Sequence, residues 1–232
     1  MTSPIRIYAV GGGSFNAGAI AIHRRLLALT GKPKPRVCFI PTASGDEPEY
    51  IRVFHEWMRE SGAEGNVYTL TRPSEGIPRE QIPDHDIIYV GGGNTARMLE
   101  LWRGRGFDRL IVQGAERGAI LSGTSAGMNC WFDCCVTDSF GPLRELMDGL
   151  GLIKGSACPH IDTEPERMPT LRRLLAEGFP AGYALDDGAA IYFEDGILKR
   201  AYAENAETGL RHVSLLETGI HEVAVEAEVL GG

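Results

Sequence analysis

The sequence predicts an α/β fold with three layers, in which a mainly parallel sheet is flanked by helices and antiparallel strands follow near the C-terminus. Short runs rich in β-branched and apolar residues alternate with longer amphipathic stretches, a pattern typical of repeated β-α-β units. Two of these runs end in glycine triplets, at residues 11–13 and 91–93. In parallel sheets, loops of this kind follow strands at the edge that binds ligands. We expect residues 1–232 to form one domain.

The first elements are expected in regular alternation. Short apolar runs predict strands at residues 5–10, 36–41, 66–70, 87–90 and 119–122. Amphipathic stretches predict helices at residues 19–30, 48–61, 95–103 and 107–117. In the last of these, Phe107, Leu110 and Ile111 recur at helical spacing, so we expect that face in the core.

The pattern changes after Gly151. Residues 152–159 are expected to form a further strand, and residues 166–177 a helix with Met168 and Leu171 on its apolar face. Short antiparallel strands are expected after this helix. Residues 189–193 and 197–203 flank the turn signal Glu194-Asp195-Gly196, which favours a hairpin.

Composition excludes several classes of partner. The chain has 43% hydrophobic and 23% charged residues, as in ordinary globular proteins, and a net charge of −8 argues against nucleic-acid or anionic-membrane binding. We see no secretory signal at the start and no apolar run of about 18 residues. The five cysteines are odd in number and lack paired CxxC spacing, so we expect reduced thiols, no metal site and a cytoplasmic protein.

The two glycine triplets predict different roles. Asn16 stands where a dinucleotide-binding loop needs its third glycine, and no phosphate-binding GxxxxGK[ST] loop occurs, so no cofactor is expected. The first triplet is therefore interpreted as a turn. After the second triplet, Asn94 and Thr95 can cap a helix, which leaves the N–H groups of Gly92 and Gly93 facing an anion or a developing oxyanion.

A nucleophile candidate follows the strand expected at residues 119–122. The segment Gly123-Thr124-Ser125-Ala126-Gly127 matches G-x-S-x-G, in which a serine stands on a sharp turn between a strand and a helix. Such a turn exposes the hydroxyl and aims the next N–H, here that of Ala126, at the oxygen of a tetrahedral intermediate. We therefore predict that Ser125 is a catalytic nucleophile.

A serine needs a base and an acid that orients it. Of the six histidines, only His160 follows an expected strand, so it should reach the same sheet edge as Ser125. Sequence spacing does not rank the candidate acids, which are Asp138, Asp162, Glu164, Asp186 and Asp187.

These motifs, in this order, resemble the peptidase E family of serine aspartyl dipeptidases, whose fold is related to the flavodoxin-like class I glutamine amidotransferases. The resemblance rests on residues 91–95, on residues 123–127 and on the pair Pro159-His160, and it spans about residues 5–195. It implies Ser125 as nucleophile, His160 as base and Asp138 as the third residue of the triad. The implied oxyanion donors are the N–H groups of Gly93 and Ala126.

The resemblance also implies a substrate. Peptidase E cleaves after an N-terminal aspartate, and Arg167 stands where the family has the arginine that holds the aspartate side chain; a guanidinium can bind a carboxylate through two parallel bonds. A surface ion pair of Arg167 with Glu164 or Glu166 is the alternative. Asn94 is included in the expected substrate site.

Other functions remain open on the sequence alone. An amidotransferase-like hydrolase, a cyanophycinase-like enzyme that cleaves β-linked aspartyl-arginine dipeptides, and a non-catalytic binding protein could share this fold. For the peptidase we expect a small peptide as the only substrate partner, and a monomer or a homodimer.

Overall fold

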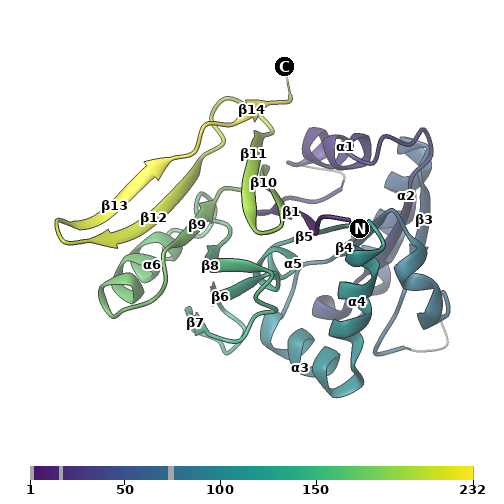
Figure 1. The fold of residues 1–232 in the computed structure, drawn as a ribbon, viewed down its shortest axis with the longest axis horizontal. Coiled ribbons are helices and arrows are strands. Elements are labelled where there is room, and N and C mark those ends of the chain that lie inside the picture. The colour runs from purple at the N-terminus through teal and green to yellow at the C-terminus, as the bar shows by residue number, and fades with distance from the viewer. Residues whose placement is uncertain (1–2, 16–17, 73–75, 232) are drawn as a thin grey trace.

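The computed structural model describes residues 3–15, 18–72 and 76–231 (Figure 1). It confirms the predicted α/β architecture with helices on both faces of a mainly parallel sheet, and it adds a second sheet. The first sheet has eight strands in the order β14-β11-β10-β1-β5-β4-β2-β3, and the second has six in the order β13-β12-β9-β8-β6-β7.

The centre of the first sheet consists of parallel strands that are apolar and buried. In spatial order they are β1 (Arg6–Val10), β5 (Ile120–Thr124), β4 (Ile87–Val90), β2 (Arg36–Ile40) and β3 (Glu64–Val67). The strand expected at residues 66–70 begins two residues earlier, because Arg36 of β2 pairs with Glu64. The predicted hairpin is confirmed as β10 (Ala189–Glu194) and β11 (Ile197–Ala203), and β10 lies antiparallel to β1. The short β14 (Glu228–Val229) completes this sheet.

Helices cover both faces of the first sheet. On one face, α1 (Ile20–Ala28) and α2 (Pro48–Ser61) enclose an aromatic cluster in which Phe15 stacks on Trp57 at 5.0 Å between ring centroids. On the other face lie α3 (Thr95–Arg105) and α4 (Phe107–Glu116), with Trp102 and Phe107 fully buried. Two 3-10 turns, η1 (Thr42–Ser44) and η2 (Arg79–Asp84), complete this half of the chain.

The second sheet packs its inner face on the core of the first. Its strands are β6 (Phe132–Thr137), β7 (Arg144–Leu146), β8 (Ile153–Cys158), β9 (Gly182–Leu185), β12 (Leu210–Leu216) and β13 (Gly219–Ala224). Helix α6 (Arg167–Ala176) covers the other face through Met168, Leu171 and Leu175. The β12–β13 hairpin projects away from the rest of the molecule (Figure 1).

This topology brings several strand ends to one place. The carboxyl ends of β1, β4 and β5 are neighbours in the first sheet, and those of β6, β8 and β9 are neighbours in the second. The loops after these strands carry Ser125, Asp138, His160 and Asp187. In the part of the chain that the structure describes, no helix has the length and apolar character that a membrane crossing requires.

Candidate active site

Ser125 stands on a sharp turn between β5 and the four-residue helix α5 (Ala126–Asn129). Its φ of 56° and ψ of −110° are unusual for a residue with a side chain, and strained backbone of this kind clusters at active sites. The glycines on both sides of this turn are needed because a side chain there would collide with the main chain of β4. A Cβ on Gly123 would lie 2.5 Å from the carbonyl oxygen of Val90, and a Cβ on Gly127 would lie 2.2 Å from the same atom. The strand, turn and helix predicted around Ser125 are therefore present.

The glycine triplet after β4 lies beside this turn. A Cβ on Gly92 would lie 3.3 Å from Cβ of Ser125, and a Cβ on Gly93 would lie 2.3 Å from the carbonyl oxygen of Ala43. Gly93 also has a φ of 134°, which a side chain disfavours. Within the described residues, no main-chain carbonyl accepts a hydrogen bond from the N–H of Gly93 or Ala126. Their role as oxyanion donors stays a prediction.

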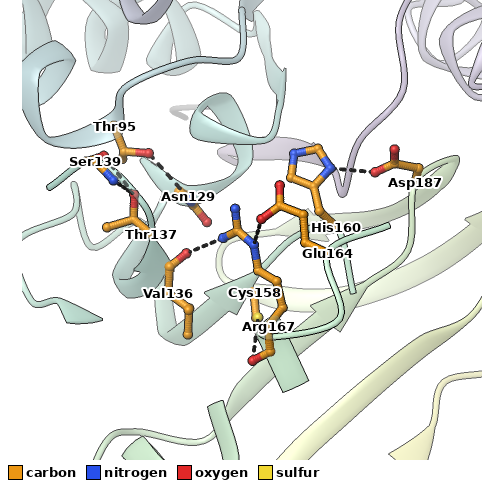
Figure 2. Close-up of polar contacts among 10 residues, drawn as sticks. All are labelled: Thr95, Asn129, Val136, Thr137, Ser139, Cys158, His160, Glu164, Arg167 and Asp187. Atoms are coloured by element: carbon orange, nitrogen blue, oxygen red, sulfur yellow. Dashed lines mark hydrogen bonds and ion pairs between the residues drawn. The ribbon is translucent and has the colours of Figure 1, made fainter. Parts of the chain in front are cut away.

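His160 is held by Asp187. His160 follows β8, and Asp187 follows the neighbouring parallel strand β9. Nδ1 of His160 lies 2.6 Å from Oδ1 of Asp187, and Figure 2 shows the imidazole ring and the carboxylate facing each other across this contact. With Nδ1 donating to the carboxylate, Nε2 is the nitrogen that can accept a proton. The side chain of His160 is 18% exposed, so a substrate can reach it.

The end of β1 and the turn after it contact the segments that carry Ser125 and Asp187. The N–H of Ser125 donates to the carbonyl oxygen of Val10 at 3.2 Å, and the N–H of Gly188 donates to the carbonyl oxygen of Gly12 at 3.1 Å. Because Gly188 directly follows Asp187, the end of β1 and the turn after it contact both halves of the site. The first glycine triplet was expected only to form a turn, and these contacts with the site were not predicted.

Replacing Gly12 with alanine is expected to lower kcat about 100-fold without unfolding the protein. The added Cβ would lie 1.8 Å from Oδ1 of Asp187 and 2.6 Å from Nδ1 of His160, so the pair has to move. Gly104→Ala in α3, where nothing lies within 4 Å of the added atom, is the matched control. Steady-state kinetics and thermal unfolding of both variants measure the effect. An unchanged kcat in Gly12→Ala contradicts it.

The structure corrects the expected partner of His160. The Nδ1 contact expected of Asp138 is made by Asp187 instead. In the second sheet β8, which precedes His160, lies between β6 and β9. Asp138 follows β6 and Asp187 follows β9, so the two acids lie on opposite sides of β8. Asp138 is exposed.

Two of the other candidate acids support the loop that holds Asp187. Oδ1 of Asp162 accepts the N–H of Asp187 at 2.9 Å, and Oδ2 of Asp186 accepts the N–H of Gly209 at 2.6 Å. Burial raises the pKa of the Asp186 carboxyl above its usual value. These bonds hold the chain at Asp186 and at the N–H of Asp187.

Asn94 is a helix cap in the structure, as its position after the triplet predicted. Its Oδ1 accepts the N–H of Arg97 at 2.9 Å, and its Nδ2 donates to the carbonyl oxygen of Ser139 at 2.9 Å. The side chain thus ties the start of α3 to the segment after β6. Contact of Asn94 with a substrate stays a prediction.

Arg167 is buried at the start of α6. Its Nε donates to Oε2 of Glu164 at 2.8 Å, and its Nη1 donates to the carbonyl oxygen of Val136 at 2.9 Å (Figure 2). The predicted alternative, an ion pair with Glu164, is confirmed, although it is a partly buried pair and not a surface one. Binding of a substrate carboxylate by Arg167 stays a prediction.

The remaining histidines belong to other parts of the fold. His23 in α1 is fully buried, with Nε2 at 2.8 Å from the hydroxyl oxygen of Tyr89, and burial lowers its pKa to about 4. His85 precedes β4, at the amino end of that strand and therefore at the sheet edge opposite Ser125. His55, His212 and His221 lie in α2, β12 and β13. The single sheet edge expected for Ser125 and His160 is wrong, because Ser125 follows β5 of the first sheet and His160 follows β8 of the second.

Known proteins resemble this chain over most of its length. It is 35% identical over 229 residues to the uncharacterized peptidase YgaJ of Bacillus subtilis, an alignment that covers 97% of this chain and 99% of that protein. It is 26% identical over 169 residues to peptidase E of Streptomyces coelicolor, with 68% of each chain covered. Among solved structures, a peptidase from an acI-B1 Actinobacterium superposes with a TM-score of 0.69 at 18% identity, covering 98% of this chain and 96% of that one.

The family model for peptidase family S51 matches residues 7–200. This range contains Ser125, His160 and Asp187, and it ends within β11 of the first sheet. The model spans most of the chain, and the B. subtilis relative covers nearly all of it. The chain therefore belongs to peptidase family S51, a family of serine-type peptidases that includes the peptidase E proteins.

Proposed function

We propose that this peptidase hydrolyses dipeptides or short peptides through a triad of Ser125, His160 and Asp187. The observation that carries the proposal is the 2.6 Å bond between His160 and Asp187. This pair lies against Gly12, two residues after Val10, whose carbonyl oxygen accepts the N–H of Ser125. A carboxylate on Nδ1 sets the tautomer in which Nε2 is basic, and it stabilises the imidazolium that forms during attack. Asp187 takes the role that the resemblance gave to Asp138.

In this mechanism Oγ of Ser125 attacks the carbonyl carbon of the scissile amide while Nε2 of His160 accepts the hydroxyl proton. The C–N bond of the tetrahedral intermediate then breaks, and the imidazolium returns the proton to the leaving amine. Water, deprotonated by His160, hydrolyses the acyl-enzyme and regenerates Ser125. Each half of the reaction uses the same base, so no other side chain is needed for proton transfer.

Two main-chain donors support the oxyanion in this proposal. One is the N–H of Gly93, in the triplet whose Gly92 lies beside the Ser125 side chain, and the other is the N–H of Ala126, which directly follows Ser125. Preorganised donors of this kind stabilise the negative charge that develops on the carbonyl oxygen. Glycine at position 93 is set by its φ of 134° and by the nearby Ala43 carbonyl.

The proposal also specifies the first residue of the substrate. Cleavage after an N-terminal aspartate is the preference implied by the resemblance, and it assigns the aspartate side chain to Arg167. The position of Arg167 supports this assignment. Arg167 is the first residue of α6, which follows the loop that begins at His160, and it is bonded to Glu164 in that loop. Aspartate is thus the first side chain to test, with Asn-, Glu- and Ala-leading substrates beside it.

The test combines labelling and turnover. A fluorophosphonate that reacts with activated serines is expected to label Ser125, identified by peptide mass spectrometry, and to abolish cleavage of chromogenic amides led by Asp, Asn, Glu or Ala. A β-aspartyl dipeptide in the same panel tests the cyanophycinase-like alternative. Absence of both labelling and cleavage would overturn the proposal in favour of a binding protein, and cleavage of the β-linked dipeptide alone would replace the substrate class.

A further inference from the structure

We propose that Tyr50 is a positioning residue for the oxyanion hole. Its hydroxyl accepts the N–H of Gly92 and leaves that of Gly93 as the donor that the glycine triplet offers to a substrate. This inference rests on the proposed function and adds to it a residue of α2, a helix that supplies no member of the triad. In this role Tyr50 acts through the main chain of the triplet.

The first observation is how the N–H groups of residues 91–94 are used. The N–H of Gly92 donates to the hydroxyl oxygen of Tyr50 at 3.4 Å. The N–H groups at the two ends of the loop donate to main-chain carbonyl oxygens, that of Gly91 to Ile40 at 3.1 Å and that of Asn94 to Ala43 at 2.9 Å. For the N–H of Gly93, the described residues supply no acceptor. Three of the four donors are therefore used within the protein, and Tyr50 is the one side chain among their acceptors.

The ring of Tyr50 packs directly against the triplet. A Cβ on Gly91 would lie 2.9 Å from Cε1 of Tyr50. On its other side the ring meets Phe39 of β2 edge-on, with 4.9 Å between the ring centroids and 72° between the planes. Burial raises the pKa of Tyr50 to about 12, so the hydroxyl stays neutral at neutral pH. The packed ring thus holds a neutral acceptor in one position beside the loop.

A glycine triplet needs such an external bond to hold one conformation. Glycine has more main-chain freedom than other residues, so the triplet by itself does not fix the direction of its N–H groups. The bonds from Gly92 and Asn94 hold the peptide units on either side of the one that carries the Gly93 N–H. Preorganisation of that donor is what stabilisation of an oxyanion requires. Without the Tyr50 hydroxyl one of the two bonds is lost, and the N–H of Gly92 is left without its partner.

Gly92 also lies against the nucleophile. A Cβ on Gly92 would lie 3.3 Å from Cβ of Ser125 and 3.8 Å from its Oγ. The next residue, Gly93, is exposed, so a substrate oxygen can reach its N–H. The bond to Tyr50 therefore holds the segment that relates the attacking hydroxyl to the donor for the oxyanion, and small displacements there reduce the rate.

The experiment compares Tyr50→Phe, which removes only the hydroxyl, with Tyr8→Phe. Tyr8 in β1 is fully buried, and its hydroxyl donates to the carbonyl oxygen of Ile22 at 3.1 Å, so the control also loses one hydrogen bond of a buried phenol. Tyr50→Phe is expected to lower kcat and kcat/KM about 10- to 100-fold with KM unchanged, because the displaced donor is used only in the transition state. Tyr8→Phe should leave both constants within about twofold of native.

A second measurement tests the oxyanion hole apart from turnover. The probe is an α-aminoboronic acid with the side chain of the first residue of the best amide. Its boron accepts a bond from Oγ of Ser125 while His160 takes the hydroxyl proton, which gives a tetrahedral borate with an oxygen in the position of the oxyanion. Its inhibition constant is expected to rise in Tyr50→Phe by the factor by which kcat falls, and to stay at the native value in Tyr8→Phe.

The outcomes separate this inference from the proposed function. Thermal unfolding verifies that both variants are folded. If Tyr50→Phe does not fold, Gly91→Ala serves instead, because its added Cβ displaces the Tyr50 ring and should lower kcat in the same way. Native kcat in a folded Tyr50→Phe, a loss confined to KM, or an equal loss in Tyr8→Phe overturns the role of Tyr50 alone. A native protein that is neither labelled by the fluorophosphonate nor active on the amides overturns both proposals.

Discussion

Ser125→Ala is expected to lower kcat on any cleavable amide about 10⁶-fold, which is the size of loss seen when a triad serine is removed. Alanine supplies no oxygen for the acyl bond, so only cleavage that does not pass through the acyl-enzyme remains. The backbone at this position has a φ of 56°, which is unfavourable for serine and alanine alike, so the free energy of unfolding should change little. Single-turnover kinetics and thermal unfolding measure the two effects.

Ser122→Ala is the matched control for this variant. Ser122 lies three residues earlier in β5, fully buried, and its Oγ donates to the carbonyl oxygen of Tyr8 at 2.7 Å. Its loss should reduce the free energy of unfolding by about 1 kcal/mol while leaving kcat within a few-fold of native. If Ser125→Ala retained native kcat, or if Ser122→Ala lost activity to the same degree, Ser125 could not be the nucleophile.

The central sheet could be predicted because its strands are buried on both faces. Such strands are continuous apolar runs, and β4 is Ile87–Val90 in the structure as in the prediction. The bounds predicted for the edge strand β3 were wrong because its first residues are polar or lack a side chain: Glu64, Gly65 and Asn66. Its position is set by pairing with β2 and not by its own hydrophobic pattern. The helix α2 was predicted at its observed bounds, since proline at its first position and glycine after its last one mark both ends.

The second sheet was largely missed, and the reason lies in its connections. Helix α5 is only four residues long, so the chain enters β6 at Phe132 without the long amphipathic stretch that separates strands elsewhere. The strand β9, Gly182–Leu185, is equally short and follows α6 closely. Strands this short are specified by their neighbours in the sheet, which local sequence does not reveal.

Because the second sheet was not predicted, only part of the site could be predicted. Ser125 and His160 each follow a strand that the sequence predicts, so both could be chosen as candidates, but the strands belong to two sheets and not to the single edge expected. Asp187 is 27 residues from His160 and reaches it only because β8 and β9 are adjacent. A prediction of β9 would have placed Asp187 directly after a strand, where the adjoining glycine at position 188 also signals a turn.

Asp187→Asn is expected to lower kcat about 10⁴-fold, because an amide at this position favours the wrong imidazole tautomer while keeping the geometry. Asp138→Asn, the isosteric change at the acid that the resemblance implied, is the matched comparison. The 2.6 Å bond between Oδ1 of Asp187 and Nδ1 of His160 predicts that only the first variant loses proton transfer. Asp138 is exposed, so the second should lower kcat much less.

The two variants also differ in how each loss should divide between kcat and KM. The carboxylate on Nδ1 acts on the base during proton transfer, so Asp187→Asn should lower kcat and kcat/KM equally and leave KM in place. A substrate contact at Asp138 would instead raise KM and leave kcat in place. Measuring kcat and KM of both variants therefore distinguishes an orienting acid from a binding residue. A 10⁴-fold loss confined to Asp138→Asn would return the triad role to Asp138 despite the bond seen here.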